Sequence, residues 1–138
     1  MEITVNFEYV NWLAVLGATI ATFLLGGFWY APMVFGRLWA KANGFEFDKM
    51  KERNMALMFF LAFLAQWLSA SLLAAILGPN AELGYAINVG VLIAAFFVGA
   101  STAVNYIFEN RGVPLLLING SYHIVSFAIM AAILATWQ

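Results

Sequence analysis

The chain has 138 residues, of which 64% are hydrophobic and only 9% are charged, and its formal net charge is −1. Soluble domains carry about 25% charged residues, so this composition excludes a water-soluble globule and indicates an integral membrane protein. The near-neutral charge provides no basic face for nucleic acid. The absence of cysteine excludes disulfides, thiol nucleophiles and iron–sulfur ligation.

Four apolar runs are each long enough to cross a bilayer as a helix, which needs about 20 residues. They cover residues 10–30, 55–77, 85–108 and 113–137. The second run ends at the breaker Gly78-Pro79-Asn80, and the fourth carries Pro114 in its first turn, where the missing N–H costs nothing. No run alternates apolar and polar residues as a barrel strand does. The sequence therefore predicts one domain over residues 1–138, an all-α bundle of four transmembrane helices.

The loop over residues 31–54 has a pattern of its own. Its large apolar residues and one alanine follow helical spacing at Phe35, Leu38, Trp39 and Ala42. Asn43-Gly44 ends the pattern, so we expect a short interfacial helix on the cytoplasmic side. Asp48 has the residue type of an N-cap, which predicts that the second transmembrane helix begins ahead of the membrane.

All six basic residues fall in loops on the same side of the predicted bundle, at Arg37, Lys41, Lys49, Lys51, Arg53 and Arg111. Basic residues in short loops stay in the cytoplasm. The residues ahead of the first run are acidic, which favours an uncleaved first span over a signal peptide. We therefore expect a multi-pass protein of the inner (plasma) membrane, with the 31–54 loop in the cytoplasm and both termini in the periplasm.

A stripe of small residues marks the first span, where Ala18, Thr22 and Gly26 are four residues apart. Small residues let a second helix approach closely, which matters in lipid because no hydrophobic drive brings helices together. The stripe predicts a helix-packing seam. The partner helix could belong to the same chain or to a second copy in a parallel homo-oligomer.

The third and fourth spans carry polar residues at helical spacing. Ser101, Asn105 and Glu109 share one face of the third span. The matching face of the fourth carries Asn119, Tyr122, His123 and Ser126. A hairpin about Gly112 would bring Asn105 level with Asn119 and Ser101 close to His123. We therefore expect one polar cluster between these two spans.

Two classes of function fit this cluster. His123 is the one ionisable residue well inside a span, and such a residue favours a functional site. The protein would then be a small transporter or channel-like protein for an ion or small solute. In the other class the polar groups hold helices in register, and the protein is a structural or accessory subunit of a homo-oligomer or a larger membrane complex.

Catalytic and cofactor chemistry is not expected. No Asp inside the spans could orient His123, and no G-x-S-x-G elbow precedes a serine. One histidine supplies too few ligands for a metal or haem. The sequence predicts no enzyme, no cofactor and no nucleic-acid partner. The expected partners are the lipid bilayer and a parallel copy or another membrane protein.

The N-terminal part carries a distinctive set of residues: Asn11-Trp12-Leu13-Ala14-Val15, Gly26, Trp29-Tyr30, Pro32, Phe35-Gly36, Trp39, Lys41 and Gly44. This set resembles the signature of a family of small bacterial membrane proteins, the domain of unknown function 1761. The segment from Asn119 to Met130 is similar to the C-terminal signature of that family. The resemblance covers nearly the whole chain. It implies a four-helix integral membrane protein of bacterial type, and it implies no activity.

Overall fold

The computed structural model describes residues 4–138, and this part of the chain is helical without any β-strand. The elements in chain order are α1 (Trp12–Trp29), α2 (Gly36–Asn43), the 3-10 helix η1 (Phe47–Glu52), α3 (Met55–Leu77), α4 (Leu83–Leu92), the π-helical segment η2 (Ile93–Gly99), α5 (Ala100–Phe108) and α6 (Val113–Thr136). The predicted all-α fold is confirmed.

Four helices are long and apolar enough to cross a membrane. Three of them are α1, α3 and α6, and the remaining one is the continuous helix Leu83–Phe108 formed by α4, η2 and α5. The first span begins at Trp12 rather than at residue 10, and the third begins at Leu83 rather than at residue 85. The short helix expected in the long loop is present as α2, and it ends at Gly44, whose φ of 76° is left-handed.

Polar side chains cap the first turns and so set where three spans begin. The Asn11 side chain accepts hydrogen bonds from the backbone N–H groups of Leu13 and Ala14 at the start of α1. The Glu82 carboxylate accepts from two backbone N–H groups at the start of α4, and these bonds lower the pKa of Glu82. At α3 the cap is Asn54, which accepts from the N–H of Leu57.

The interpretation of Asp48 as the cap of an extended second helix is wrong. Asp48 lies in the first turn of η1, which has its own short 3-10 helical path and ends before Arg53. The backbone of Arg53 is extended, and α3 starts afresh at Met55 behind the Asn54 cap. Because a second capping residue interrupts the chain here, the helix of the second span does not continue back into the loop.

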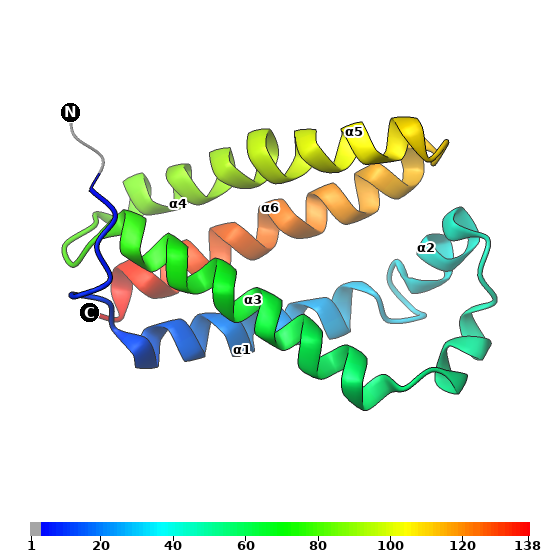
Figure 1. The fold of residues 1–138 in the computed structure, drawn as a ribbon, viewed down its shortest axis with the longest axis horizontal. Helices are drawn as coiled ribbons and strands as arrows, with labels where there is room; N and C mark the ends of the chain where they lie inside the picture. Colours follow the sequence, from blue (N-terminus) through cyan, green and yellow to red (C-terminus); the bar gives the residue numbers. More distant parts are fainter. Residues whose placement is uncertain (1–3) are drawn as a thin grey trace.

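Helix α6 occupies the centre of the arrangement. It packs against α4 on one side and α1 on the other, and α3 packs mainly against α1. Figure 1 shows α6 between the long α4–α5 helix and α1, with α3 crossing α1. The termini and the 78–82 turn lie at one end of the bundle, which we call the terminal end. The loops that carry all six Lys and Arg residues lie at the other end, which we call the basic end.

The apolar core lies mainly in the half of the bundle towards the terminal end. It is built largely from alanine, contributed by all four spans at Ala14, Ala18, Ala70, Ala74, Ala86, Ala94 and Ala131, with Leu73, Phe127 and Met130 among them. Small residues let helices in lipid approach closely and gain dispersion contacts. Towards the basic end α3 diverges from α6 in Figure 1, and its first half exposes Leu57, Phe59, Phe60 and Leu61. Close apolar packing therefore holds the terminal half, and other contacts must hold the basic half.

The closest approach of α4 to α6 is at Gly90. A Cβ atom at this position would lie 2.7 Å from the backbone oxygen of Phe127 and 3.1 Å from Cβ of Ala131. The first of these contacts is closer than real Cβ atoms allow, and a backbone oxygen cannot turn away as a side chain can. Glycine at this position is what permits the two helices to pack as they do.

We therefore expect Gly90→Ala to lower the free energy of unfolding by about 1–3 kcal/mol, the usual cost of overpacking a close contact. The matched control is Gly120→Ala on α6, where an added Cβ meets nothing within 4 Å. This control should be neutral or slightly stabilising, since alanine is the better helix former. Thermal and denaturant unfolding in detergent measures both changes. Equal stability of the two variants would contradict the close approach.

Candidate functional site: a polar cluster between the spans

The turn after α1 brings two aromatic side chains against α6. The indole N–H of Trp29 donates to the backbone oxygen of Ile118 at 3.0 Å. The hydroxyl of Tyr30 donates to Oδ1 of Asn119 at 2.6 Å. The backbone N–H of Phe35 donates to the oxygen of Trp29, which closes the turn and holds both rings in place. The aromatic corner ahead of α2 thus anchors the end of α1 on α6.

Asn119 uses both ends of its amide to connect two spans to its own. Its Oδ1 accepts from Tyr30, and its Nδ2 donates to the hydroxyl of Tyr106 on α5 at 2.6 Å. An amide has a donor and an acceptor side by side, so it can bridge two hydroxyl groups on opposite flanks of one helix. The ends of α1 and α5 nearest the basic loops are therefore held to α6 through one residue.

Tyr122 lies one turn further along α6 and connects this helix to α3 and, a second time, to α1. Its hydroxyl accepts from Nε2 of Gln66 on α3 at 2.8 Å and donates to the backbone oxygen of Thr22 on α1 at 3.2 Å. The side chain is buried, with 8% of its surface exposed. A Cβ atom on Gly26 would lie 3.0 Å from this hydroxyl, so the glycine makes room for it. Together, Asn119 and Tyr122 connect all four spans.

The predicted packing stripe lies within this arrangement. Ala18 and Thr22 have no exposed surface, and Gly26 faces the Tyr122 hydroxyl. The Thr22 hydroxyl donates back to the oxygens of Ala18 and Thr19 in its own helix. The structure thus places the stripe against α6 of the same chain, with Ala18 and Thr22 fully covered and Gly26 partly covered.

The other predicted cluster residues are placed differently. His123 is half-buried with its ring 5.3 Å from that of Tyr122, and its nitrogens form no hydrogen bond within residues 4–138. Ser126 is fully buried, and its hydroxyl has no partner in the described part of the chain. Ser101 and Asn105 are exposed, and neither side chain bonds to another described residue. The structure therefore does not bring Asn105 to Asn119.

The contact with Asn119 that the sequence predicts for Asn105 is made by Tyr106 instead. Neighbouring residues on a helix point about 100° apart, so only one of the two can face α6. The π-helical segment Ile93–Gly99 precedes them, and such a segment rotates the helix that follows relative to an unbroken α-helix. Sequence spacing carries no sign of that rotation. A tyrosine near a helix end also resembles an ordinary interfacial residue, which hides its role in the cluster.

Glu109 lies at the basic end, outside the polar cluster. Its carboxylate accepts from Nε of Arg111 at 2.7 Å, and both side chains are largely exposed. Arg111 also donates to Oδ1 of Asn43, so this turn is connected to the end of α2. An exposed ion pair of this kind contributes little to stability, and the role of Glu109 here is a contact at the bundle end.

Sequence reasoning leaves Tyr30 and Tyr106 out of the candidate site, and it offers Gln66 on the second span only as a residue that could complete a polar core. All three are neutral side chains that become important only through the neighbour each one meets. Gln66 is a polar residue in the middle of an apolar span, and that position is the signal that points to it. For the two tyrosines the sequence offers no signal beyond a hydroxyl near a helix end.

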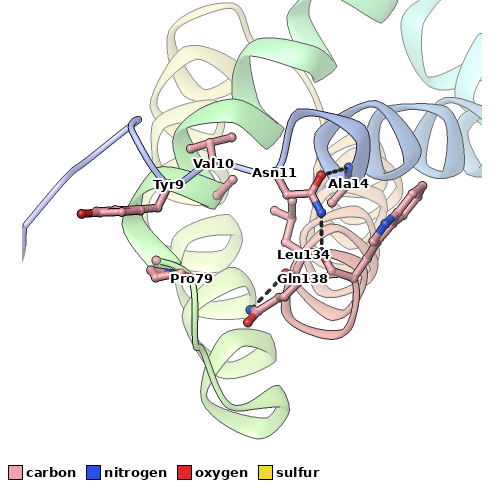
Figure 2. A pocket seen from close by; sticks show the side chains of 10 residues that line it. Tyr9, Val10, Asn11, Ala14, Pro79, Leu134 and Gln138 are labelled. Atoms are coloured by element: carbon pink, nitrogen blue, oxygen red, sulfur yellow. Dashed lines mark hydrogen bonds between the residues drawn. The ribbon is translucent and has the colours of Figure 1, made fainter.

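The chemistry of the cluster is that of neutral hydrogen bonds. No group of three His, Cys, Asp or Glu residues that could hold a metal occurs among the described residues. A cavity of about 140 Å³ lies at the terminal end, lined by residues that include Tyr9, Asn11, Pro79 and Gln138. Figure 2 shows the Asn11 amide beside it, donating to the backbone oxygen of Trp137. This cavity is far along α6 from His123 and does not include it.

The fold and the cluster define an α-helical protein with four helices long and apolar enough to cross a membrane, three of which are joined by polar contacts to the fourth, central helix α6. The chain belongs to the family described as protein of unknown function (DUF1761), whose model matches residues 13–135. This confirms the family that the sequence resembles. Comparison with curated proteins gives no match, and comparison with solved structures also gives none.

We expect Tyr122→Phe to lower the free energy of unfolding by about 1 kcal/mol. The change keeps the ring but removes the bonds to Gln66 and Thr22, and interhelical bonds in membranes contribute about 0.6 kcal/mol each on average. The matched control is Tyr85→Phe, because Tyr85 is exposed and its hydroxyl bonds to no described residue. Unfolding in detergent or bicelles measures both. Equal free energies of unfolding for the two variants would show that the Tyr122 contacts do not stabilise the bundle.

Proposed function

We propose that this protein is a non-catalytic accessory subunit of the bacterial inner membrane. In this proposal it associates laterally with a second, parallel copy of itself through an exposed face of α5. The observation that carries the proposal is the placement of Ser101 and Asn105. Both side chains are exposed on a span of which only 11% is buried, and neither finds a partner within residues 4–138.

Polar groups that face hydrocarbon without a hydrogen-bond partner raise the free energy of a single chain. A side-chain amide facing lipid tails is unfavourable unless a donor or acceptor reaches it. Ser101 and Asn105 are one turn apart, so they present their groups on one face of α5. Inside the bundle the Asn119 amide and the Tyr122 hydroxyl are already bonded to other spans, and the unpaired hydroxyl of Ser126 is fully buried, so none of these groups is open to a second chain. The outward pair is therefore available for another chain.

A second copy meets the chemical requirement of this face. An asparagine amide carries both a donor and an acceptor, so two copies related by a two-fold axis can pair Asn105 with Asn105. That axis must run along the membrane normal, because basic loops keep the same end of every copy in the cytoplasm. The proposal accordingly places the basic end in the cytoplasm and the termini in the periplasm.

The decisive experiment compares Asn105→Leu with Asn88→Leu. Both asparagines are exposed on the same span and lack a described side-chain partner, but they lie at opposite ends of it. Resonance energy transfer between labelled copies in liposomes measures dimerisation as lipid dilutes the protein. We expect Asn105→Leu to weaken the dimer about three- to tenfold, the value of one interhelical hydrogen-bond pair, and Asn88→Leu to leave it unchanged.

Two outcomes would overturn this proposal. One is a wild-type protein that stays monomeric at all lipid ratios tested. The other is an equal loss of association in both variants, since a general effect of leucine on the lipid-facing surface would then explain the result. Unfolding of each variant in detergent serves as the folding control, because the side chain of neither asparagine forms a hydrogen bond within residues 4–138.

A second candidate function rests on His123, the one His, Asp, Glu, Lys or Arg residue within the four spans. Its ring is half-buried and unbonded in the described chain, so it could bind an ion or a small solute on a transport path. Under the accessory proposal, proteoliposomes should show no pH-dependent flux above protein-free vesicles, and His123→Phe should change nothing. A flux that His123→Phe abolishes while the bundle stays folded would establish transport instead.

A further inference from the structure

We propose that α2 is a binding surface for the headgroups of anionic phospholipids, with Arg37 and Lys41 as the residues that contact phosphate. The inference does not depend on the accessory role or on dimerisation, because it concerns a single copy of the chain. Three properties of α2 support it: the position of the helix at the basic end, the chemistry of its exposed face, and its positive charge.

The position of α2 is set by its contacts with the bundle. The helix packs against α6, its residues Gly36 and Ala40 are buried, and Gly36 lies against the backbone of Tyr30 and the Phe47 ring. Arg111, in the turn between α5 and α6, donates to the Asn43 side chain at the end of α2. Figure 1 shows α2 at the basic end of the bundle, where α1 ends and α6 begins. The helix is therefore held at the level where apolar spans emerge from the hydrocarbon layer.

The face of α2 turned away from the bundle combines positive charge with apolar surface. Arg37 and Lys41 are one turn apart and exposed, and α2 contains no acidic residue. Leu38 lies beside them with 58% of its surface exposed, and Met33 just ahead of the helix is 94% exposed. Basic residues beside exposed apolar side chains are typical of a helix lying in the membrane interface.

Arg37 and Lys41 have no acidic partner among the described residues, which is also true of Lys51 and Arg53, but Arg37 and Lys41 lie one turn apart on one helix. Lys49 pairs with Glu46, and Arg111 pairs with Glu109. The Arg37 guanidinium lies 5.6 Å from the centre of the Phe47 ring, a contact that orients the group but leaves its N–H donors free. Two free cations one turn apart can bind one phosphate together or two neighbouring ones.

Charge selects the lipid class. A zwitterionic headgroup brings its own cation next to the phosphate, whereas an anionic headgroup such as phosphatidylglycerol leaves the negative charge unpaired. Juxtamembrane Lys and Arg residues favour anionic lipid by about fivefold each, and the effect is strongest close to the surface. Leu38 and Met33 would lie towards the acyl boundary, which keeps the two cations at phosphate depth.

The experiment reconstitutes the full chain in an equimolar mixture of phosphatidylglycerol and phosphatidylcholine and counts the retained lipids by native mass spectrometry. The test variant is Arg37→Gln with Lys41→Gln. The control is Lys49→Gln with Lys51→Gln, which removes the same charge from η1 at the same end of the bundle. We expect the wild type and the control to prefer phosphatidylglycerol, and the α2 variant to lose at least about fivefold of that preference.

Two further measurements keep the outcome decisive. Excess inorganic phosphate should fail to displace the lipid, because a free anion lacks the acyl chain that places it at this depth. Unfolding in phosphatidylcholine alone should be the same for all three proteins, since the changed side chains are exposed. The proposed surface would be overturned if both double variants lost the preference for phosphatidylglycerol equally. A wild-type protein without that preference would also overturn it.

Discussion

A hydrogen-bonding group inside a bilayer must find its partner within protein, because hydrocarbon offers none, and this constraint governs the basic half of the bundle. Asn119 and Tyr122 lie one turn apart on the central helix α6. They satisfy this constraint through four hydrogen bonds to other spans. Each bond is modest, but together they fix the rotation of α6 against α1, α3 and α5. The aromatic turn after α1 then has a defined surface on which to close.

The two halves of the bundle are stabilised by different means. Towards the terminal end, alanines and Gly90 bring the helices so close that dispersion contacts suffice. Towards the basic end, α3 diverges and the large side chains of its first half face outwards. Polar bonds there add to the packing of Leu115, Ile118 and the aromatic side chains of the turn after α1. The small-residue stripe on α1 serves both halves, since Ala18 joins the apolar core and Gly26 makes space for Tyr122.

The division between inward and outward polar groups bears most directly on function. Asn119 and Tyr122 bond to groups of the other spans, whereas the Ser126 hydroxyl and the His123 ring have no hydrogen-bond partner in the described part of the chain. Groups that α5 turns outwards are unpaired in one chain, and unpaired amides in lipid favour association. At the basic end, α2 adds a third kind of surface, positively charged and apolar together. These surfaces are the basis of the accessory role and of the lipid contact that we propose.

Much of this architecture could be predicted from the sequence, because it depends on local properties of the chain. Span number follows from the lengths of the apolar runs, and α2 follows from the spacing of Phe35, Leu38 and Trp39 with Gly44 as its end. The grouping of all basic residues at one end of the bundle follows from loop composition and the parity of the spans. The family resemblance also rests on short local motifs, and the matched family confirms it.

The membership of the polar cluster could not be predicted in the same way. Asn105 and Tyr106 are adjacent, and the choice between them depends on the rotation of α5, which the π-helical segment before it alters. The pairing of Tyr30 with Asn119 likewise requires the turn after α1 to fold back on a helix 89 residues away in sequence. Hydropathy and periodicity describe one helix at a time, whereas hydrogen bonding between spans depends on how each helix is turned towards the others.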